Sequence, residues 1–406
     1  MVFSNVTLRV AATGAPPLSY QWKKDGSILS DGGNVSGANT PGLTISLPQL
    51  ADSGEYQVIV TDQSGSVSTN ASLTVVPVYA WGDSPITPPA NATNFMTIAT
   101  GGSILHANFG VHADGTVVGW GWNEMMDIPA DATNVIEVIA GYDQAIAIRH
   151  DGTATTWGMG GSTVPAIATN VVAAAIQNYT GCLALRQDGS IVAWNGATAP
   201  PPNVTNMIAI AAGAWGSAVG IRQDGTFISW GANDYGQGSP PAEATNVIAL
   251  ACGDRHTLAL RADGVIIGFG MTGTHTTPPP DATNIVAIAA GQEISLALRA
   301  DGKAIGFGNV ASAPPFLTNC VAIDACYAHN LALVQDPSVR VPPVLIQQPL
   351  GGIAQPGSTF ILLSRVAGSQ PMAYSWMLNG SLLPDQTNRF LLLSPFQTVQ
   401  GGAYQI

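Results

Sequence analysis

The chain has 406 residues, of which 46% are hydrophobic and 9% are charged, so it is long enough for a large core or several domains. Its formal net charge is −12, which disfavours nucleic acid and anionic lipid as partners because both repel an acidic protein. No apolar run approaches the roughly 20 residues of a membrane-spanning helix, so we expect no membrane insertion. Low charge with abundant Thr, Ser, Asn and Gly favours an extracellular or cell-surface bacterial protein.

Residues 1–75 consist of short runs in which apolar and polar residues alternate, as expected of β-strands. Trp22 lies in one run, and Tyr56 lies in a later one. Their placement resembles the immunoglobulin pattern, in which a buried Trp packs between two sheets and the Tyr forms a tyrosine corner. Val10 and Val58 stand where that pattern has two cysteines, so burial without a cross-link must hold the sheets together. We expect an immunoglobulin-like domain whose first strand is missing.

Residues 76–342 repeat one phrase seven times, and its clearest copy is DATNIVAIAAGQEISLALRADGKAIGFGN, from Asp281 to Asn309. An Asp-Gly pair recurs in six of the copies at intervals of about 37 residues, at Asp114, Asp151, Asp188, Asp224, Asp263 and Asp301. Asp-Gly between two apolar runs favours a β-hairpin, because its turn needs residues that tolerate positive φ. We expect four short strands in each unit, the last of them a polar piece that ends in Pro-Pro.

A Thr-Asn pair opens each unit, and the last unit begins at Asn319 and loses the pattern after NLALVQDP. The missing part stands at the other end of the repeat, as VYAWGDSPITPP from Val78. We therefore expect residues 78–88 to complete the seventh unit. This closure predicts an all-β, seven-bladed β-propeller.

Residues 343–406 repeat the immunoglobulin-like pattern, with Trp376 and Tyr404 placed as Trp22 and Tyr56 are in the first domain. The pattern breaks off before its last strand. We expect a second immunoglobulin-like domain that is truncated at its C-terminal end. We find no signal-peptide pattern before the first expected strand, and we expect the sequence to be a piece of a longer protein.

The repeats are similar to those of the regulator of chromosome condensation and of β-lactamase-inhibitor protein II. The resemblance covers about 260 residues and all seven units. The period and the order AGxxxSLALRxDGxxxxWG look closer to the inhibitor, in which one face of the ring binds a partner protein through aromatic and acidic loop residues. The resemblance implies a propeller and a binding function without naming the partner.

The two faces of such a ring are expected to carry different residues, with nearly the same residues repeated on one face and variable loops on the other. Before the Asp-Gly turns an Arg recurs, at Arg149, Arg186, Arg222, Arg261 and Arg299. We expect these side chains to bond turn aspartates and free carbonyl oxygens, with an anion-binding ring as the alternative.

The opposite face carries the loops that differ between units, and variable loops on a rigid frame are where binding is usually found. Tyr, Trp and Arg are also the commonest interface hot spots. The candidate binding residues are Trp122, Glu124, Tyr142, Asp143, Tyr179, Trp215, Asp234, Tyr235, Asp254, Arg255, Glu293 and Tyr327. The alternative is that these aromatic residues only cover the rim.

The sequence contains no HExxH, CxxC, P-loop or GxSxG motif, so we expect no enzyme, no cofactor and no metal. His256 is interpreted as a structural imidazole, and the four cysteines as small core side chains. Asp143, Asp254, Glu293 and Glu124 could supply a carboxylate pair of the glycosidase or lyase kind, which needs a separation of roughly 5–10 Å.

We expect a non-catalytic extracellular binding or adhesion module that recognises a protein partner through the variable loops. The alternative is a carbohydrate-binding or carbohydrate-active surface protein, with a polysaccharide as its partner. A purely structural surface array is the third interpretation.

Overall fold

The protein is described from a computed structural model of residues 1–406. The structure describes residues 5–46, 48, 50–83, 86–102, 106–122, 124–159, 163–309, 312–315, 317–327, 329–335 and 340–406. All regular elements in these ranges are β-strands or short 3-10 turns, which confirms the expected all-β class. No helix in the described part of the chain is long and apolar enough to cross a membrane. The chain divides into two compact units, Met1–Pro77 with Pro89–Thr93, and Val78–Pro88 with Asn94–Ile406.

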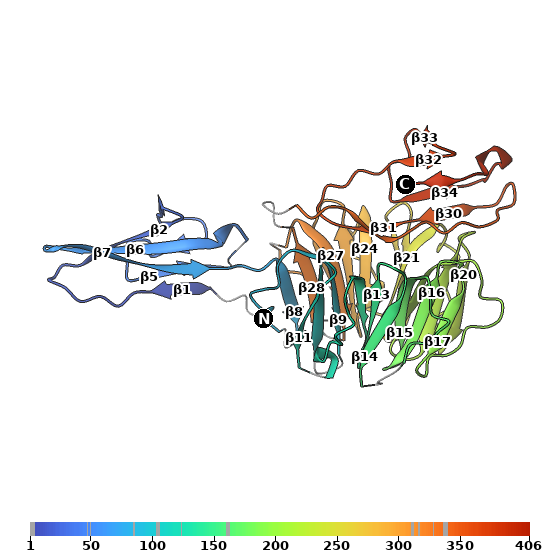
Figure 1. The fold of residues 1–406 in the computed structure, drawn as a ribbon, viewed down its shortest axis with the longest axis horizontal. Coiled ribbons are helices and arrows are strands. Elements are labelled where there is room, and N and C mark those ends of the chain that lie inside the picture. The colour runs from blue at the N-terminus through green and yellow to red at the C-terminus, as the bar shows by residue number, and fades with distance from the viewer. Residues whose placement is uncertain are drawn as a thin grey trace. The chain divides into compact units, whose positions relative to one another are not determined.

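The first unit is a sandwich of two antiparallel sheets, drawn in blue in Figure 1. Its strands are β1 (Val6–Arg9), β5 (Gly42–Ile45) and β4 (Val35–Ser36) in one sheet, and β3 (Ser27–Ile28), β2 (Ser19–Lys24), β6 (Gly54–Asp62) and β7 (Gly65–Leu73) in the other, with a 3-10 turn η1 at Leu50–Asp52. Trp22 is buried and donates its indole N–H to the Thr40 carbonyl oxygen at 2.9 Å. The Tyr56 hydroxyl donates to the Asp52 carbonyl oxygen at 2.7 Å, which is the tyrosine corner predicted from the sequence.

No disulfide joins the two sheets of this unit, since all four cysteines of the chain are free and lie elsewhere. Val58 is buried, and Val10 packs against the same apolar cluster.

The repeat region folds into seven three-stranded antiparallel sheets within the described residues. In chain order they are β9 (Phe95–Gly101), β10 (Ala107–His112) and β11 (Val117–Gly121); β12 (Val135–Ala140), β13 (Gln144–Arg149) and β14 (Ala154–Gly158); β15 (Val171–Gln177), β16 (Gly181–Arg186) and β17 (Ile191–Trp194); β18 (Met207–Ala212), β19 (Ser217–Arg222) and β20 (Phe227–Gly231); β21 (Val247–Cys252), β22 (His256–Arg261) and β23 (Ile266–Gly270); β24 (Ile285–Ala290), β25 (Ile294–Arg299) and β26 (Ala304–Gly308); and β27 (Cys320–Cys326), β28 (His329–Val334) and β8 (Val78–Gly82). Two 3-10 turns, η2 (Glu124–Met126) and η3 (Thr274–Thr276), follow the first and fifth of these sheets.

The expectation of four strands in each unit was wrong, because the described residues of the Pro-containing pieces form no strand. Several of their prolines begin turns instead. The amide of Ala132 donates to the carbonyl oxygen of Pro129 at 2.9 Å, and Ala282 bonds Pro279 in the same way. Proline has no amide hydrogen for a strand ladder, so a Pro-rich piece turns more readily than it pairs.

Neighbouring sheets are joined at the Asp-Gly turns. The asparagine of each Thr-Asn pair has a positive φ of 51–58°, which Asn tolerates better than most residues. This conformation directs the next amide to the turn of the preceding sheet, as when Val135 donates to the Gly115 carbonyl oxygen at 3.0 Å. The turn needs glycine, because a Cβ on Gly115 would lie 2.6 Å from the Asn134 Cα.

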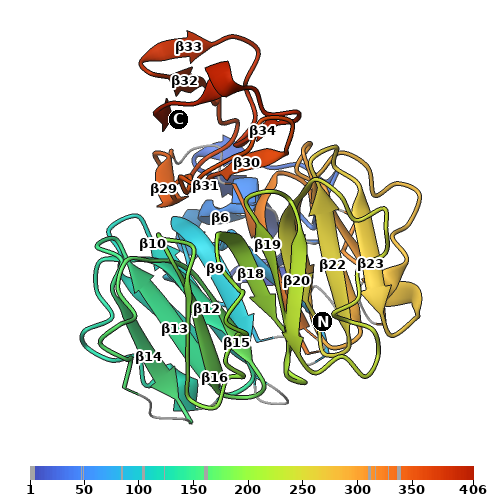
Figure 2. The same cartoon turned by 90° about the vertical axis from the view of Figure 1, so that its right-hand side faces the viewer.

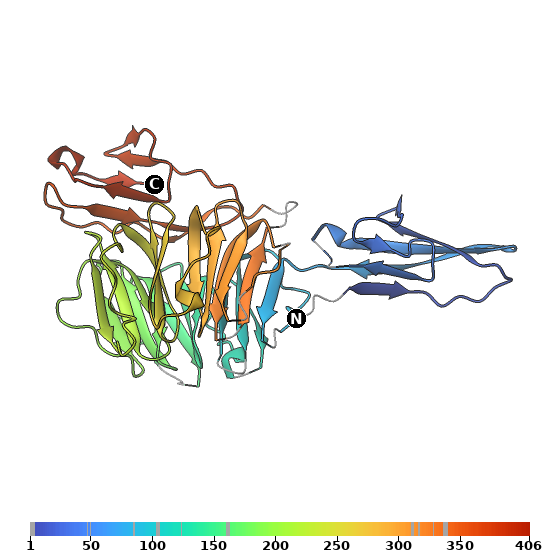
Figure 3. The same ribbon diagram turned by 180° about the vertical axis from the view of Figure 1, so that it is seen from behind.

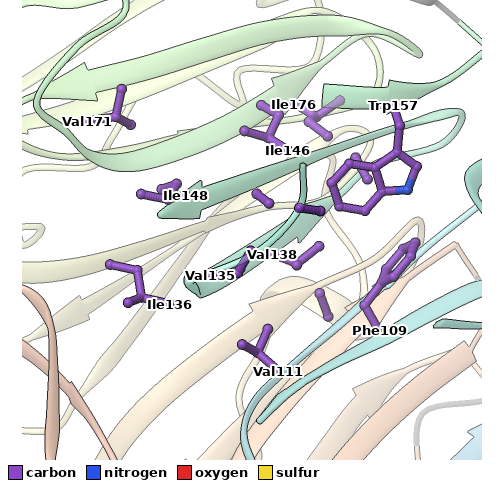
Figure 4. Packing of buried hydrophobic residues seen from close by; sticks show 14 of the residues in the cluster. Phe109, Val111, Val135, Ile136, Val138, Ile146, Ile148, Trp157, Val171 and Ile176 are labelled. Carbon is purple, nitrogen blue, oxygen red and sulfur yellow. The ribbon is translucent and has the colours of Figure 1, made fainter. Parts of the chain in front are cut away.

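The first strands of successive sheets contact one another from β9 through β12, β15, β18, β21 and β24 to β27, and β27 contacts β9 again. Figures 2 and 3 show these sheets standing side by side. The last sheet is completed by β8, which pairs antiparallel with β28 and sets Trp81 opposite Asn330. Aromatic side chains fill the space between sheets, as Phe109 and Trp157 do in Figure 4, with ring centroids 5.6 Å apart.

Residues 343–406 form the pairs β29 (Val344–Gln347) with β31 (Arg365–Ala367) and β30 (Phe360–Leu363) with β34 (Phe390–Leu393). A third sheet has the order β33 (Ser381–Leu383), β32 (Trp376–Leu378) and β35 (Tyr404–Gln405), and η4 spans Thr398–Gln400. Trp376 is fully buried, and the Tyr404 hydroxyl donates to the Gln400 carbonyl oxygen. These two residues therefore repeat the arrangement of Trp22 and Tyr56.

This C-terminal region packs on the side of the sheets that carries the Asp-Gly turns. The Gln347 side-chain amide donates to the Ile208 carbonyl oxygen at 2.9 Å, and the Ile361 amide donates to the Gln223 carbonyl oxygen at 2.8 Å. The Arg365 guanidinium forms an ion pair with the Glu137 carboxylate. A channel of about 450 Å³, surrounded by the first strands of the sheets, is bounded by residues of β29 and β31.

Candidate binding face

The loops between the first and second strands of neighbouring sheets are bonded to one another through their backbones. The Asp143 amide donates to the Tyr179 carbonyl oxygen at 3.2 Å, and the Asn178 amide donates to the Gly213 carbonyl oxygen at 3.2 Å. The Gln292 amide donates to the Tyr327 carbonyl oxygen at 3.0 Å. These bonds join several of the loops, and we call the surface that the loops on this side form the loop face.

Asp254 is the buried centre of the loop face, with only 3% of its surface exposed. The Tyr142 hydroxyl lies 2.7 and 2.9 Å from its two carboxylate oxygens, and the Trp215 indole N–H donates to one of them at 3.1 Å. Burial raises the pKa of Asp254, whereas the two donors lower it. Burial also raises the pKa of Tyr142, so its hydroxyl keeps the hydrogen that it donates.

Tyr142 also orders two neighbouring tyrosines. Its ring meets the ring of Tyr179 edge-on with centroids 5.2 Å apart, and the ring of Tyr327 edge-on at 6.0 Å. A cavity of about 70 Å³ lies beside these residues and is lined also by Asp254 and Cys326. Since one water occupies about 30 Å³ of liquid, this space holds one or two waters and no organic ligand. The centre of the loop face therefore offers little space beside Asp254.

Arg255 lies between two aromatic rings at the surface. Its guanidinium carbon is 4.4 Å from the ring centroid of Trp215 and 4.9 Å from that of Tyr235. Each cation–π contact contributes about 0.5–1 kcal/mol at an exposed site, so the stack limits the freedom of all three side chains. Trp215 is 47% exposed and Tyr235 is 41% exposed, so both keep surface for a partner.

Seven of the twelve predicted site residues belong to this contact network, namely Tyr142, Tyr179, Trp215, Tyr235, Asp254, Arg255 and Tyr327. Trp122 follows β11 and is the most exposed of the face's large aromatic residues, at 69%. Asp234 is exposed and Asp143 is partly buried. Glu293 accepts a hydrogen bond from the Asn309 side chain and raises the pKa of Asp254 electrostatically. The side chain of Glu124 lies outside the described part of the structure.

Sequence reasoning missed Gln237, which shapes one loop of this face. Its side-chain oxygen accepts the Tyr235 amide at 2.9 Å, and its carbonyl oxygen accepts the Thr257 hydroxyl at 2.8 Å. Only the position of Gln237 in a Gly-rich turn, DYGQG, marks it in the sequence.

Four of the six histidines, His106, His256, His275 and His329, are buried. The His256 Nε2 lies 2.9 Å from the Ser295 hydroxyl, and the His329 Nε2 lies 3.0 Å from the Asn108 side-chain oxygen. Burial lowers the pKa of both to about 3, so both are neutral at physiological pH. In the described ranges, no group of three or more His, Cys, Asp or Glu residues gathers in a way that could hold a metal ion.

The recurring arginines on the opposite side mostly bond the turn aspartates of their own sheets. Arg186 pairs with Asp188 at 3.0 Å, as do Arg261 with Asp263 at 2.7 Å and Arg299 with Asp301 at 2.8 Å. Arg149 differs, because it pairs with Asp131 of the preceding connection at 2.7 Å.

Comparison with known proteins gives one family match, at the N-terminal domain, and several similar proteins and structures. Residues 3–75 match the immunoglobulin I-set domain. Over 82 residues, the chain is 39% identical to the decoration protein of Escherichia phage T5. This stretch is 19% of the chain and 45% of that protein, so the chain spans less than half of its curated relative. The titin M3 domain covers 18% of the chain and 79% of its own length, with 33% identity and a TM-score of 0.16.

The structure of Prp20p from Saccharomyces cerevisiae, which was described together with its binding to Gsp1p and histones, covers 66% of this chain and 94% of its own length. The identity is 16% and the TM-score is 0.51, so the likeness concerns the fold alone. Prp20p is of the regulator of chromosome condensation family, and its fold fits a propeller for the repeat region. The chain thus carries an immunoglobulin I-set domain at residues 3–75, followed by a region that resembles a propeller of that type.

Proposed function

We propose that the chain is a non-catalytic binding module, which captures a protein partner on the loop face of a seven-bladed propeller. In this proposal the seven three-stranded sheets are the blades, and residues 78–88 close the ring. Residues 1–75 and 343–406 are immunoglobulin-like spacers. The setting is extracellular or on a cell surface, in keeping with the low charge of the chain.

The observation that carries the proposal is the stack of Trp215, Arg255 and Tyr235 above the buried Asp254. Trp, Tyr and Arg dominate binding energy at protein interfaces. A cluster that is already ordered before binding loses less side-chain entropy when the partner arrives. Contacts between a partner and the half-exposed rings would therefore contribute to the free energy of binding with little loss to side-chain ordering.

Two features of the loop face favour binding over catalysis. The Tyr142 hydroxyl shares its single hydrogen between the two carboxylate oxygens of Asp254, and one of these oxygens also accepts from Trp215. The adjoining cavity, at about 70 Å³, is too small for a sugar ring. A carboxylate that is occupied by protein donors and closed to substrate is suited to holding side chains in place.

The proposal is tested with the immobilised full chain, which is exposed in parallel to soluble protein fractions and to a glycan array. Each captured protein is then purified and titrated against the chain in solution. Tyr235→Ala and Tyr179→Ala should each weaken a genuine complex about tenfold or more, as expected for hot-spot residues. Trp215 is avoided because its indole N–H also supports Asp254.

Val265→Ala is the matched control, because Val265 is 45% exposed and follows an Asp-Gly turn away from the loop face. It should leave the affinity unchanged. Equal affinity of Tyr235→Ala and the original chain for every purified partner would remove the loop face from the interface. Saccharide binding that depends on the exposed rings of Trp122 and Tyr179 would instead support the carbohydrate interpretation.

A further inference from the structure

A second site lies between the C-terminal region and the turn ends of the last three sheets, away from the loop face. This cavity has a volume of about 740 Å³, which is within the range of sites that hold small organic molecules. Asn284 and Asn319 line it from the sheets, and Met372, Tyr374 and Arg389 line it from the C-terminal region. Pockets of this size commonly form where two domains pack together.

Four charged side chains line this cavity, Asp263, Asp301, Arg299 and Arg389, and one of them lacks an ion-pair partner. Asp263 and Asp301 are paired with Arg261 and Arg299 at 2.7 and 2.8 Å. The remaining cation of the wall is Arg389, which has no ion-pair partner among the described residues.

Arg365, the other arginine that acts on Arg389, does not neutralise its charge. Arg365 forms its ion pair with Glu137, and it repels Arg389. Burial, followed by this repulsion, lowers the pKa of Arg389. The side chain is enclosed by protein and keeps a partly exposed surface where it faces the cavity.

Arg389 is held in place by its backbone. The Ser364 amide and hydroxyl both donate to the Arg389 carbonyl oxygen. The next residue begins β34, which pairs with β30 along its whole length. The guanidinium is therefore carried by an ordered strand end.

A second donor lines the same cavity. The Tyr374 hydroxyl has the Met372 sulfur, 3.5 Å away, as its hydrogen-bond partner, and sulfur is a weak acceptor. Burial raises the pKa of Tyr374, so the hydroxyl keeps its hydrogen at neutral pH. Arg389 and Tyr374 thus both present hydrogen-bond donors to the cavity, while Met372, Val366 and Phe390 supply apolar wall.

We propose that this cavity binds a small organic monocarboxylate, with its carboxylate paired to Arg389 and its apolar body against Met372 and Val366. A planar guanidinium and a carboxylate match in a two-pronged hydrogen-bonded pair. An enclosed charge without a counter-ion is costly, and such a ligand removes that cost. The net charge of −12 opposes anions, and it opposes those with several charges, such as nucleotides, most strongly. One unpaired Arg is therefore best matched by a single carboxylate.

The test titrates benzoate into the full chain by isothermal calorimetry, with benzamide as the uncharged control of the same shape. Benzoate should bind with a Kd on the order of 1 mM, as expected for a ligand of so few atoms. Benzamide should bind at least tenfold more weakly. Arg389→Met should abolish benzoate binding, and Arg389→Lys should weaken it several-fold because the paired geometry is lost.

Arg340→Met is the matched control, since Arg340 is exposed and does not line the cavity. It should bind benzoate like the original chain. Tyr374→Phe provides a second variant that keeps the packing of the ring, and it should weaken benzoate binding without affecting benzamide. Absence of benzoate binding, equal binding of benzamide, or full binding by Arg389→Met would each overturn the proposal. Because this site is away from the loop face, its failure would leave the proposed partner-binding function unaffected.

Discussion

Replacing Tyr142 with Phe removes one hydroxyl from the centre of the loop face while keeping the ring. That hydroxyl lies 2.7 and 2.9 Å from the oxygens of Asp254, a residue with 3% of its surface exposed. Hydrogen bonds to charged groups contribute about 1.5–3 kcal/mol to stability. Because Trp215 continues to donate to Asp254, we expect the lower part of that range, about 1.5–2 kcal/mol, to be lost from the free energy of unfolding.

The measurement is equilibrium urea unfolding of the full chain at pH 8 and pH 4, which follows the transition of the second unit. The hydroxyl stabilises the charged form of Asp254, whose pKa burial raises from its ordinary value of 3.8. The loss should therefore be present at pH 8 and smaller at pH 4, where more of the carboxyl is protonated in the folded state. Tyr235→Phe is the control, since the Tyr235 ring is 41% exposed and stacks on Arg255. An equal loss at both pH values, or an equal loss in Tyr235→Phe, would refute the reasoning.

Two further predictions concern ionisable groups of the second unit. The Ser295 hydroxyl donates its hydrogen to the His275 carbonyl oxygen at 2.7 Å, so His256 must be the donor to Ser295. Burial lowers the pKa of His256 in the folded protein to about 3, from an ordinary value of 6.5. Between these pH values the unfolded chain binds the extra proton, so stability should fall with falling pH by up to about 1.4 kcal/mol per pH unit, and His256→Gln should flatten this slope in urea unfolding. Arg365→Met leaves the Glu137 carboxylate without its partner. Because the Arg365 side chain is 38% exposed and solvent screens the pair, the loss should be about 1 kcal/mol, and adding Glu137→Gln should restore most of it. Equal unfolding midpoints for the single and double variants would contradict this.

Local patterns in the sequence predicted the strands well, because each depends on neighbouring residues. The Asp-Gly turns, the Trp22 and Tyr56 pair, and the antiparallel sheets all follow from short-range spacing. The prediction of a fourth strand was wrong for a local reason too, since the prolines of these pieces lack the amide hydrogens that a strand ladder needs.

The candidate site was predictable in composition and unpredictable in geometry. Sequence reasoning could place Tyr142 and Asp254 on loops of the same side, but they are 112 residues apart, and the arrangement of separate sheets brings them into contact. Their burial depends on that contact, so neither is a surface residue, whereas Trp122 and Tyr179 are. The cavity around Arg389 left no pattern in the sequence, because it forms between the C-terminal region and the sheets.

The pairing of β8 with β28 has a consequence for synthesis on the ribosome. Trp81 and Asn330, which face each other across this pair, are separated by 249 residues. At roughly 5–20 residues per second, about 12–50 seconds pass between the emergence of the two strands from the ribosome. During that interval the nascent chain exposes a strand whose Val78, Ala80 and Trp81 are all buried once folding is complete. We expect chaperones that hold apolar segments to act on this protein at that stage, before the last sheet is made.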